Sequence, residues 1–174
     1  MFVYFSLDRI AHRMAASPSE VRDAAQEFIA LIEDEAMSSE DRMTRLRRSL
    51  DRLAYLEHDV SYTFDERDYR DAPRKDYSAM RQLVAAHFPE LGFYNTPDSV
   101  THDIAETKIS VGDAIDDISD ITIDLYEVLW RFDHTSVNDA LWYFEFSCVS
   151  HWEYHLRELQ VCLQRLASGH EDAV

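Results

Sequence analysis

The sequence contains few of the residues that end helices and build turns. Its 174 residues include only three glycines and four prolines, and residues 19–72 and 113–168 contain neither type. Strands joined by hairpins need turn residues about every 8–12 positions. Two such long blocks therefore predict an all-α fold. A glycine-rich phosphate-binding loop is excluded as well, because it needs several glycines within a few positions.

Cysteines and long apolar segments are also scarce. The two cysteines, Cys148 and Cys162, lie 14 positions apart. On one helix they would be roughly 21 Å apart, whereas a disulfide needs Cα atoms within about 7 Å. No apolar segment approaches the ~20 residues that span a membrane, and the first residues lack the pattern of a secretory signal. We therefore expect no disulfide within the monomer and a cytoplasmic location.

Positive charge is the third scarcity. The chain has 17 Lys and Arg against 34 Asp and Glu, which gives a formal net charge of −17. Nucleic acid and anionic membrane surfaces would both repel such a chain, so neither is expected as a partner. With 46% apolar and 12% aromatic residues, the chain is predicted to be globular rather than disordered. Most of the negative charge lies in residues 82–174, which hold 17 acidic and 4 basic residues.

Apolar residues at helical spacing predict the individual helices. Ser17-Pro18-Ser19-Glu20 is typical of a capping box and predicts a helix that begins there. Ser38 and Ser39, followed by two acidic residues, predict the start of a second helix. A third helix is expected between Pro73 and Phe88, because proline disfavours helix in the residue before it. Residues 59–72 and the segment FPELGFYNTPD are predicted to be loops.

Two long helices are predicted for the C-terminal half, over residues 103–133 and 137–168, and they are expected to pack antiparallel. The chain is thus predicted to be a single-domain bundle of about five helices. Its parts are an N-terminal segment over residues 1–16, which could add a short helix, the bundle domain over 17–168 and a tail over 169–174.

The predicted helix over residues 103–133 is apolar around more than half of its circumference. Its remaining face is an acidic stripe of six carboxylates with no basic residue among them: Asp113, Asp116, Asp117, Asp120, Asp124 and Glu127. Charge runs are usually solvated faces. Like charges at helical spacing destabilise a helix, however, so compensation from elsewhere is expected. The stripe is therefore interpreted either as an ordinary solvated face or as a binding face for a basic partner or a divalent cation.

The predicted helix over residues 137–168 carries a histidine pair. His151 and His155 are four positions apart and fall on the predicted apolar face, with Glu158 beside them. This spacing lets one helix offer two nitrogens to a metal ion, although a further ligand from another helix would be needed. The alternative interpretation is a pair of half-buried histidines that form hydrogen bonds with tyrosines or carboxylates of neighbouring helices.

These segments also resemble a known family. The runs VGDAIDDISDITIDLYEVLWRF and DALWYFEFSCVSHWEYHL, with FPELGFY upstream, resemble an uncharacterised bacterial family described as domain of unknown function 5063. The resemblance covers roughly residues 19–167, and its specific part is 112–156. His151, Trp152 and His155 match the family's HWxxH pattern. Four aspartates match its acidic helix: Asp113, Asp116, Asp117 and Asp120.

The resemblance implies an all-helical fold and assigns no activity. The chain departs from the family pattern at Glu145, Val149 and Glu153, where the family has Arg, an acidic residue and Gly. The change of Arg to Glu at position 145 removes a candidate counter-ion for the acidic helix.

Two functions are consistent with these features. The first is a non-enzymatic interaction module, similar to an inhibitor or immunity protein, which binds a basic protein partner through the acidic stripe or self-associates and needs no cofactor. The second is a metal-dependent hydrolase with a divalent metal ion on His151, His155 and Glu158 and on carboxylates of the preceding helix. For the second function, a helical wheel predicts that the acids point away from the core and the histidines toward it. No catalytic residue is assigned.

Overall fold

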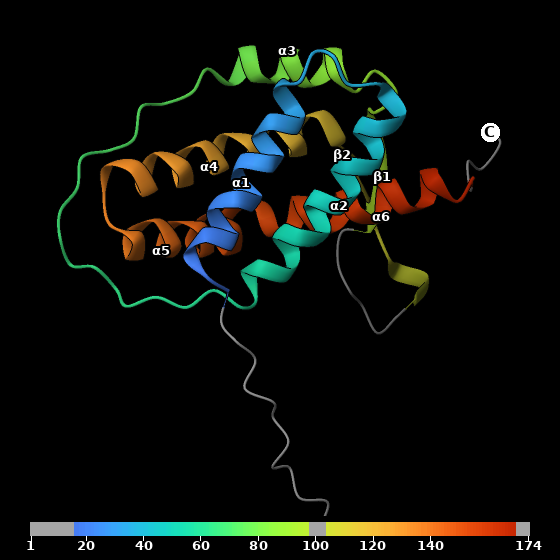
Figure 1. Cartoon of the computed structure of the whole chain (residues 1–174). Coiled ribbons are helices and arrows are strands. Elements are labelled where there is room, and N and C mark those ends of the chain that lie inside the picture. The colour runs from blue at the N-terminus through green and yellow to red at the C-terminus, as the bar shows by residue number, and fades with distance from the viewer. Residues whose placement is uncertain (1–15, 98–103, 170–174) are drawn as a thin grey trace, which may run out of the picture.

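The computed structural model describes residues 16–97 and 104–169, and it shows a helical bundle with one small hairpin (Figure 1). The predicted mostly helical, single-domain bundle is confirmed. The hairpin consists of β1 (Phe93–Pro97) and β2 (Ile109–Asp113), with the short helix η1 (Ile104–Glu106) before β2. The helices are α1 (Pro18–Glu33), α2 (Ser39–Glu57), α3 (Tyr77–His87), α4 (Ala114–His134), α5 (Val137–Ser147) and α6 (Glu153–Ala167).

The predicted helix starts are confirmed by their caps. The Glu20 amide donates to the Ser17 hydroxyl and the Ser17 amide donates to the Glu20 carboxylate, which completes the capping box of α1. Ser38 accepts a hydrogen bond from the backbone of Asp41 at the start of α2. These side chains satisfy amides that the first helical turn leaves without partners.

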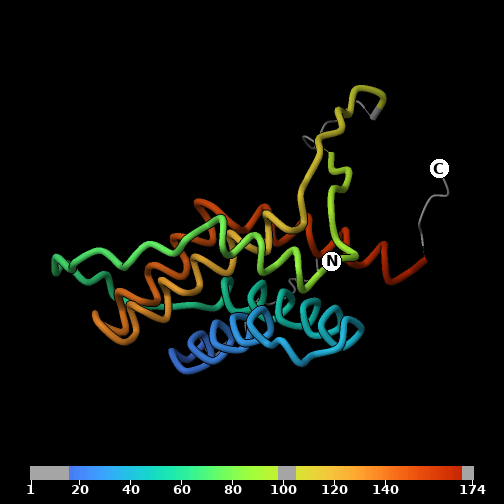
Figure 2. The backbone as a smooth tube through the Cα atoms, turned by 90° about the horizontal axis from the view of Figure 1, so that it is seen from above, coloured from blue at the N-terminus to red at the C-terminus, as the bar shows by residue number. Residues whose placement is uncertain are grey.

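Helix α4 lies at the centre of the bundle. It packs against α1, α3, α5 and α6, while α2 packs against α1 and α6. Figure 2 shows α1 and α2 as one layer and α4 with α5 and α6 as a second. Large apolar side chains fill the space between the layers and are almost fully buried, including Phe28, Leu50, Ile118, Ile121, Leu125, Phe144 and Trp152.

The prediction of a helix over residues 103–133 is wrong for the residues before Ala114. Residues 109–113 form β2, which pairs antiparallel with β1, and β1 lies in the segment that was predicted to be a loop. Helix α4 begins only at Ala114, because the Asp113 carboxylate accepts hydrogen bonds from the amides of Ile115 and Asp116 and caps the helix there. The hairpin stands out from the helices in Figure 2.

Glycine at position 112 makes room for an aromatic ring of the hairpin. Tyr94 is paired with Gly112 across the hairpin, and its ring lies over the glycine. A Cβ atom at position 112 would come within 2.4 Å of the ring, so only glycine leaves room for it.

The helix predicted over residues 137–168 is present but irregular. Between α5 and α6, residues Cys148–Trp152 form a π turn, in which the Glu153 amide donates to the Cys148 carbonyl oxygen. The combined helix runs antiparallel to α4, as predicted (Figure 1). A π turn takes up one more residue than an α turn, so it changes the face on which later side chains lie.

An irregular segment over residues 60–76, here called the strap, links α2 to α3 along the outside of the bundle (Figure 1). The loop predicted over residues 59–72 is confirmed, since none of these residues belongs to a helix or strand. Three hydrogen bonds attach its first half to α5 and its cap: Tyr62 to Glu145, the Thr63 amide to Asn138, and Ser136 to Asp65.

The structure also bears on the predictions about the cysteines, membrane-spanning helices and the two ends of the chain. Cys148 and Cys162 are both free, as predicted. No described helix is both long and apolar enough to cross a membrane. The possible helix within residues 1–16 lies outside the described residues except for Ala16, and the tail over residues 169–174 does so except for Gly169.

Candidate metal centre between α4 and α6

The acidic stripe of α4 is not a free face. None of its six carboxylates is fully exposed, because α6, the hairpin and the strap lie around them. At the ends of the stripe the partners are arginines: Arg81 binds Asp113 at 2.6 Å and Arg131 binds Glu127 at 2.7 Å. Arg81 of α3 supplies the compensation expected from elsewhere in the chain, whereas Arg131 lies four residues after Glu127 on α4 itself.

In the middle of the stripe the partners are the two histidines. The His151 Nδ1 atom lies 2.8 Å from Asp124 Oδ2, and the His155 Nδ1 atom lies 2.6 Å from Asp117 Oδ1. The two imidazoles lie edge to face, with ring centroids 5.8 Å apart. The sequence prediction that acids and histidines point in different directions is wrong, since they face each other between α4 and α6.

The π turn explains this difference. A regular helix over residues 137–168 would place His151 and His155 on the apolar face, but 48% and 28% of their side-chain surfaces are exposed. Trp152, between them, is fully buried. The additional residue of the π turn moves both histidines to the edge of the apolar face, next to α4.

Asp120 completes a group of three side chains. Its Oδ2 atom lies 3.8 Å from His151 Nε2 and 3.9 Å from His155 Nε2. One potential ligand atom of each of the three residues lies within 4.8 Å of the other two, so the three atoms are close enough to share one metal ion. Glu158, which sequence reasoning placed with the histidines, is not in this group. It accepts a hydrogen bond from the hydroxyl of Thr96 in β1.

The carboxylates bound to Nδ1 orient the imidazoles. An imidazole that donates from Nδ1 to a carboxylate leaves Nε2 as the free nitrogen, which is the common arrangement of histidine ligands in metal sites. Asp117 is itself held in place, because only 4% of its side chain is exposed and the Tyr94 hydroxyl donates to its Oδ2 atom at 2.5 Å. Burial raises the pKa of Tyr94, so its hydroxyl stays protonated and remains a donor.

The burial of the carboxylates affects proton binding. Burial raises the pKa of Asp120 and of Asp124, and the nearby histidine His151 opposes the effect in both cases. The hydrogen bond that His155 donates to the Asp117 carboxylate raises the pKa of His155. Asp120, Asp124 and His155 therefore bind protons more readily than isolated side chains would, and a positive ion next to Asp120 and His155 would compete with those protons.

The comparisons with known proteins concern the family and the fold. Residues 14–168 match the family described as domain of unknown function 5063 (DUF5063). The chain belongs to this family. No curated protein matches the DUF5063 chain significantly. Its fold is similar to the crystal structure of protein BF1032 from Bacteroides fragilis, with a TM-score of 0.67 and 18% identity over 85% of this chain and 90% of that chain.

The roles of two residues, Tyr94 and Glu145, could not be predicted from the sequence. Tyr94 fell in a predicted loop, and the only signal for its position was the glycine at 112, whose partner across the hairpin was unknown. Glu145, where the resemblance implied Arg, binds the strap and not the acidic stripe. The Tyr62 hydroxyl donates to it, and this hydrogen bond raises the pKa of Tyr62 to about 12.

Proposed function

We propose that this DUF5063 protein binds a divalent transition-metal ion through Asp120, His151 and His155 and uses the ion for hydrolysis. One observation carries the proposal. The Nε2 atoms of both histidines face the same Asp120 oxygen, at 3.8 Å and 3.9 Å, while separate carboxylates hold both Nδ1 atoms. Two half-buried core histidines would need hydrogen-bond partners, but they would not need to converge on a third group.

The distances between the three side chains are close to those of a metal site. Ligand atoms bound tetrahedrally at about 2.0–2.1 Å from a zinc ion lie about 3.3 Å from one another. The two measured separations are longer by about half an ångström, which small side-chain rotations can close. Two imidazole nitrogens and one carboxylate oxygen suit zinc, iron and similar ions.

Three protein ligands leave coordination positions open for water. A metal ion lowers the pKa of bound water toward neutrality and so supplies a hydroxide nucleophile, which is the basis of metal-assisted hydrolysis. The partial exposure of His151 leaves a path from solvent to the centre of the group. Asp117 and Asp124 would then act as positioning residues that fix the imidazole orientation.

The hypothesis of an interaction module that binds a basic partner stays a prediction. Its motivation was a stripe of carboxylates without partners, whereas four of the six carboxylates now have a partner in Arg81, Arg131, His151 or His155. The stripe therefore no longer favours this hypothesis over others.

Metal titration of the untagged, chelator-treated protein tests the proposal. We expect one equivalent of Zn²⁺ or Mn²⁺ to bind by calorimetry, and His151→Ala, His155→Ala and Asp120→Asn each to weaken binding more than the roughly 10–100-fold typical of residues that only orient ligands. His58→Ala is the matched control, because His58 pairs with Glu57 outside the group. No binding by the wild type, or equal binding by all four variants, would overturn the proposal.

A further inference from the structure

The outer face of the hairpin is apolar and exposed. Phe93 and Val111 are the two most exposed large apolar side chains of the described residues, at 78% and 68%, and Ile109 is 63% exposed. Residues paired directly across two antiparallel strands lie on the same face. The register therefore places all three on one face, which consists of Phe93, Asn95, Pro97, Ile109, Val111 and Asp113.

The opposite face of the hairpin is held against the helices. The hydroxyls of Tyr94 and Thr96 in β1 donate to the carboxylates of Asp117 in α4 and Glu158 in α6. Because side chains alternate along a strand, these two contacts keep the apolar face turned to solvent. Single exposed apolar residues are common, whereas a contiguous apolar patch on a protein surface marks an interaction site. The outer face is therefore a candidate interaction surface.

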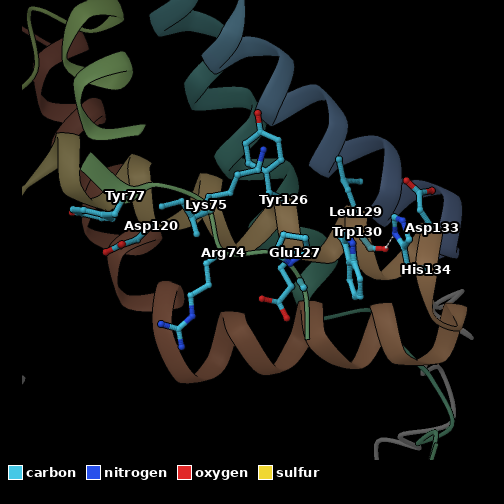
Figure 3. Close-up of a pocket in the computed structure, with 13 residues that line it drawn as sticks. Arg74, Lys75, Tyr77, Asp120, Tyr126, Glu127, Leu129, Trp130, Asp133 and His134 are labelled. Atoms are coloured by element: carbon cyan, nitrogen blue, oxygen red, sulfur yellow. Dashed lines mark hydrogen bonds between the residues drawn. The ribbon is translucent and has the colours of Figure 1, made fainter. Parts of the chain in front are cut away.

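The rings of α4 that face the strap, by contrast, are covered from within the chain. A pocket of about 580 Å³ lies between the strap and α4, and Lys75 of the strap lies on its aromatic wall (Figure 3). The Lys75 ammonium is 3.4 Å from the centroid of the Tyr126 ring, and the Arg70 guanidinium is 5.4 Å from that of Trp130. Among the described residues, no cation or ring covers Phe93 in this way.

A hollow lies beside Phe93, between α3 and the base of the hairpin. Its volume is about 470 Å³, and it is lined on one side by Ser78, Gln82 and Ala85 of α3 and on the other by Gly92 and Phe93. A cavity of about 150 Å³ is enough to hold a benzene ring. The small side chains of Ser78 and Ala85 and the absence of a side chain at Gly92 therefore leave room for an aromatic ring.

The hairpin face and the hollow carry two charges, and these neutralise each other. Arg81 of α3 binds Asp113 at 2.6 Å, and the other residues of the face and of the hollow walls are uncharged. A strongly basic or acidic partner would find no unpaired charge here. The chain has a net charge of −17, so two copies repel each other wherever their acidic surfaces meet. The neutral face avoids most of that repulsion.

We infer that two copies of this chain associate through this face, with Phe93 of each copy in the hollow of the other. Phe93 and the hollow are neighbours on one surface. A two-fold axis that brings Phe93 of one copy to the hollow of its partner therefore brings the partner's Phe93 to the hollow of the first. Val111 lies farther from α3 than Phe93 does, so it would pack over the partner's α3. The hairpin stands out from the helices (Figure 2), so it can reach a second copy before the helices meet.

The size of this contact predicts a weak dimer. Three exposed apolar side chains present roughly 300 Å² per copy, and the walls of the hollow add to this area. A stable interface of standard size buries about 800 Å² per partner, whereas smaller ones are typical of transient complexes. We therefore expect a reversible dimer with a Kd of about 1–100 µM.

Analytical ultracentrifugation of the full chain in the presence of a chelator tests the inference. From about 1 to 500 µM protein, the mean mass should rise from the 20.4 kDa of one chain toward twice that value. Phe93→Ser should weaken association by about 10-fold or more, as expected for the loss of an aromatic side chain at the centre of an interface. This variant should unfold at the wild-type temperature, because Phe93 is exposed. The control is Phe64→Ser, which removes a phenylalanine of the strap that is 61% exposed and should change the Kd by less than about 2-fold.

A mixture of two variants tests whether Phe93 enters the hollow. Ala85→Arg places a long charged side chain in the hollow and leaves Phe93 intact, so it should also weaken self-association by about 10-fold or more. When it is mixed with Phe93→Ser, it supplies the phenylalanine and the other variant supplies the open hollow. One of the two contacts can then form, so the mixture should associate at concentrations at which neither variant does so alone.

Three results would overturn the inference. These are a monomer at every concentration, equal weakening by Phe93→Ser and Phe64→Ser, and a mixture that associates no better than its components. The dimer does not rest on the proposed metal centre. In chelator, His151→Ala should associate as the wild type does, so metal binding and association can fail separately.

Discussion

Replacing Tyr94 with phenylalanine tests the support of the candidate metal centre. The substitution removes the hydroxyl that donates to Asp117 at 2.5 Å and leaves the ring over Gly112 in place. Only 4% of the Asp117 side chain is exposed, so water cannot freely replace the lost donor. A hydrogen bond to a charged group contributes about 1.5–3 kcal/mol. We expect the free energy of unfolding to fall by that amount.

For a chain of this length, about 1 kcal/mol corresponds to a change in Tm of roughly 2–4 °C, so Tm should fall by roughly 3–12 °C. Chemical unfolding followed by circular dichroism, together with a thermal scan, measures both quantities. The control is Tyr77→Phe, because Tyr77 is exposed and should tolerate the loss of its hydroxyl within about 0.5 kcal/mol. If both variants unfold alike, the hydrogen bond between Tyr94 and Asp117 does not stabilise the fold and the reasoning is refuted.

Three further predictions follow from the described contacts. The pKa of His155 is raised in the folded state. Its contribution to stability is therefore complete below about pH 6.5 and is lost as the pH rises through the folded pKa. Urea unfolding in the presence of a chelator should show this decline in stability for the wild type and not for His155→Gln. Gly112→Ala should displace the Tyr94 ring and lower the free energy of unfolding by about 1–3 kcal/mol, measured by urea unfolding. In native protein, iodoacetamide should modify Cys162 before Cys148, because Cys148 is buried and its thiol pKa is strongly raised by burial; mass spectrometry identifies the site.

Each of these predictions has a control. The same decline with pH in wild type and His155→Gln would mean that other groups cause it. Gly92→Ala should be nearly neutral, because a Cβ at that position meets no atom within 4 Å, and an equal loss in both glycine variants would contradict the close approach at Gly112. Equal alkylation rates for the two cysteines in folded protein would contradict the burial of Cys148, and both should react equally in urea.

Local signals were sufficient for the starts of the helices. Ser17 and Ser38 stand immediately before apolar residues at helical spacing, and each cap forms within three residues of chain. Such hydrogen bonds depend on neighbours in sequence and can be predicted from it. The central position of α4 could also be predicted, because its apolar arc is too wide for a surface helix.

The candidate site could be predicted only in part, because it depends on contacts between distant segments. The histidine spacing and the acidic stripe are visible in the sequence, but a helical wheel gives the direction of a side chain and not what packs against it. The wheel also assumed regular geometry through residues 148–152, where the π turn occurs. Tyr94 reaches Asp117 through a hairpin whose strands are only five residues long, which is too short for a clear alternating pattern.

The π turn makes the site sensitive to the backbone geometry of residues 148–152 as well as to the ligand residues. If this segment closed as a regular α-helix without losing a residue, the side chains that follow it would rotate by about 100° around the helix axis. The histidines would then turn toward the apolar face and away from Asp117 and Asp124, although every ligand residue would still be present in the sequence. A related chain can thus keep the complete histidine and aspartate motif and still lack the convergence of the three side chains.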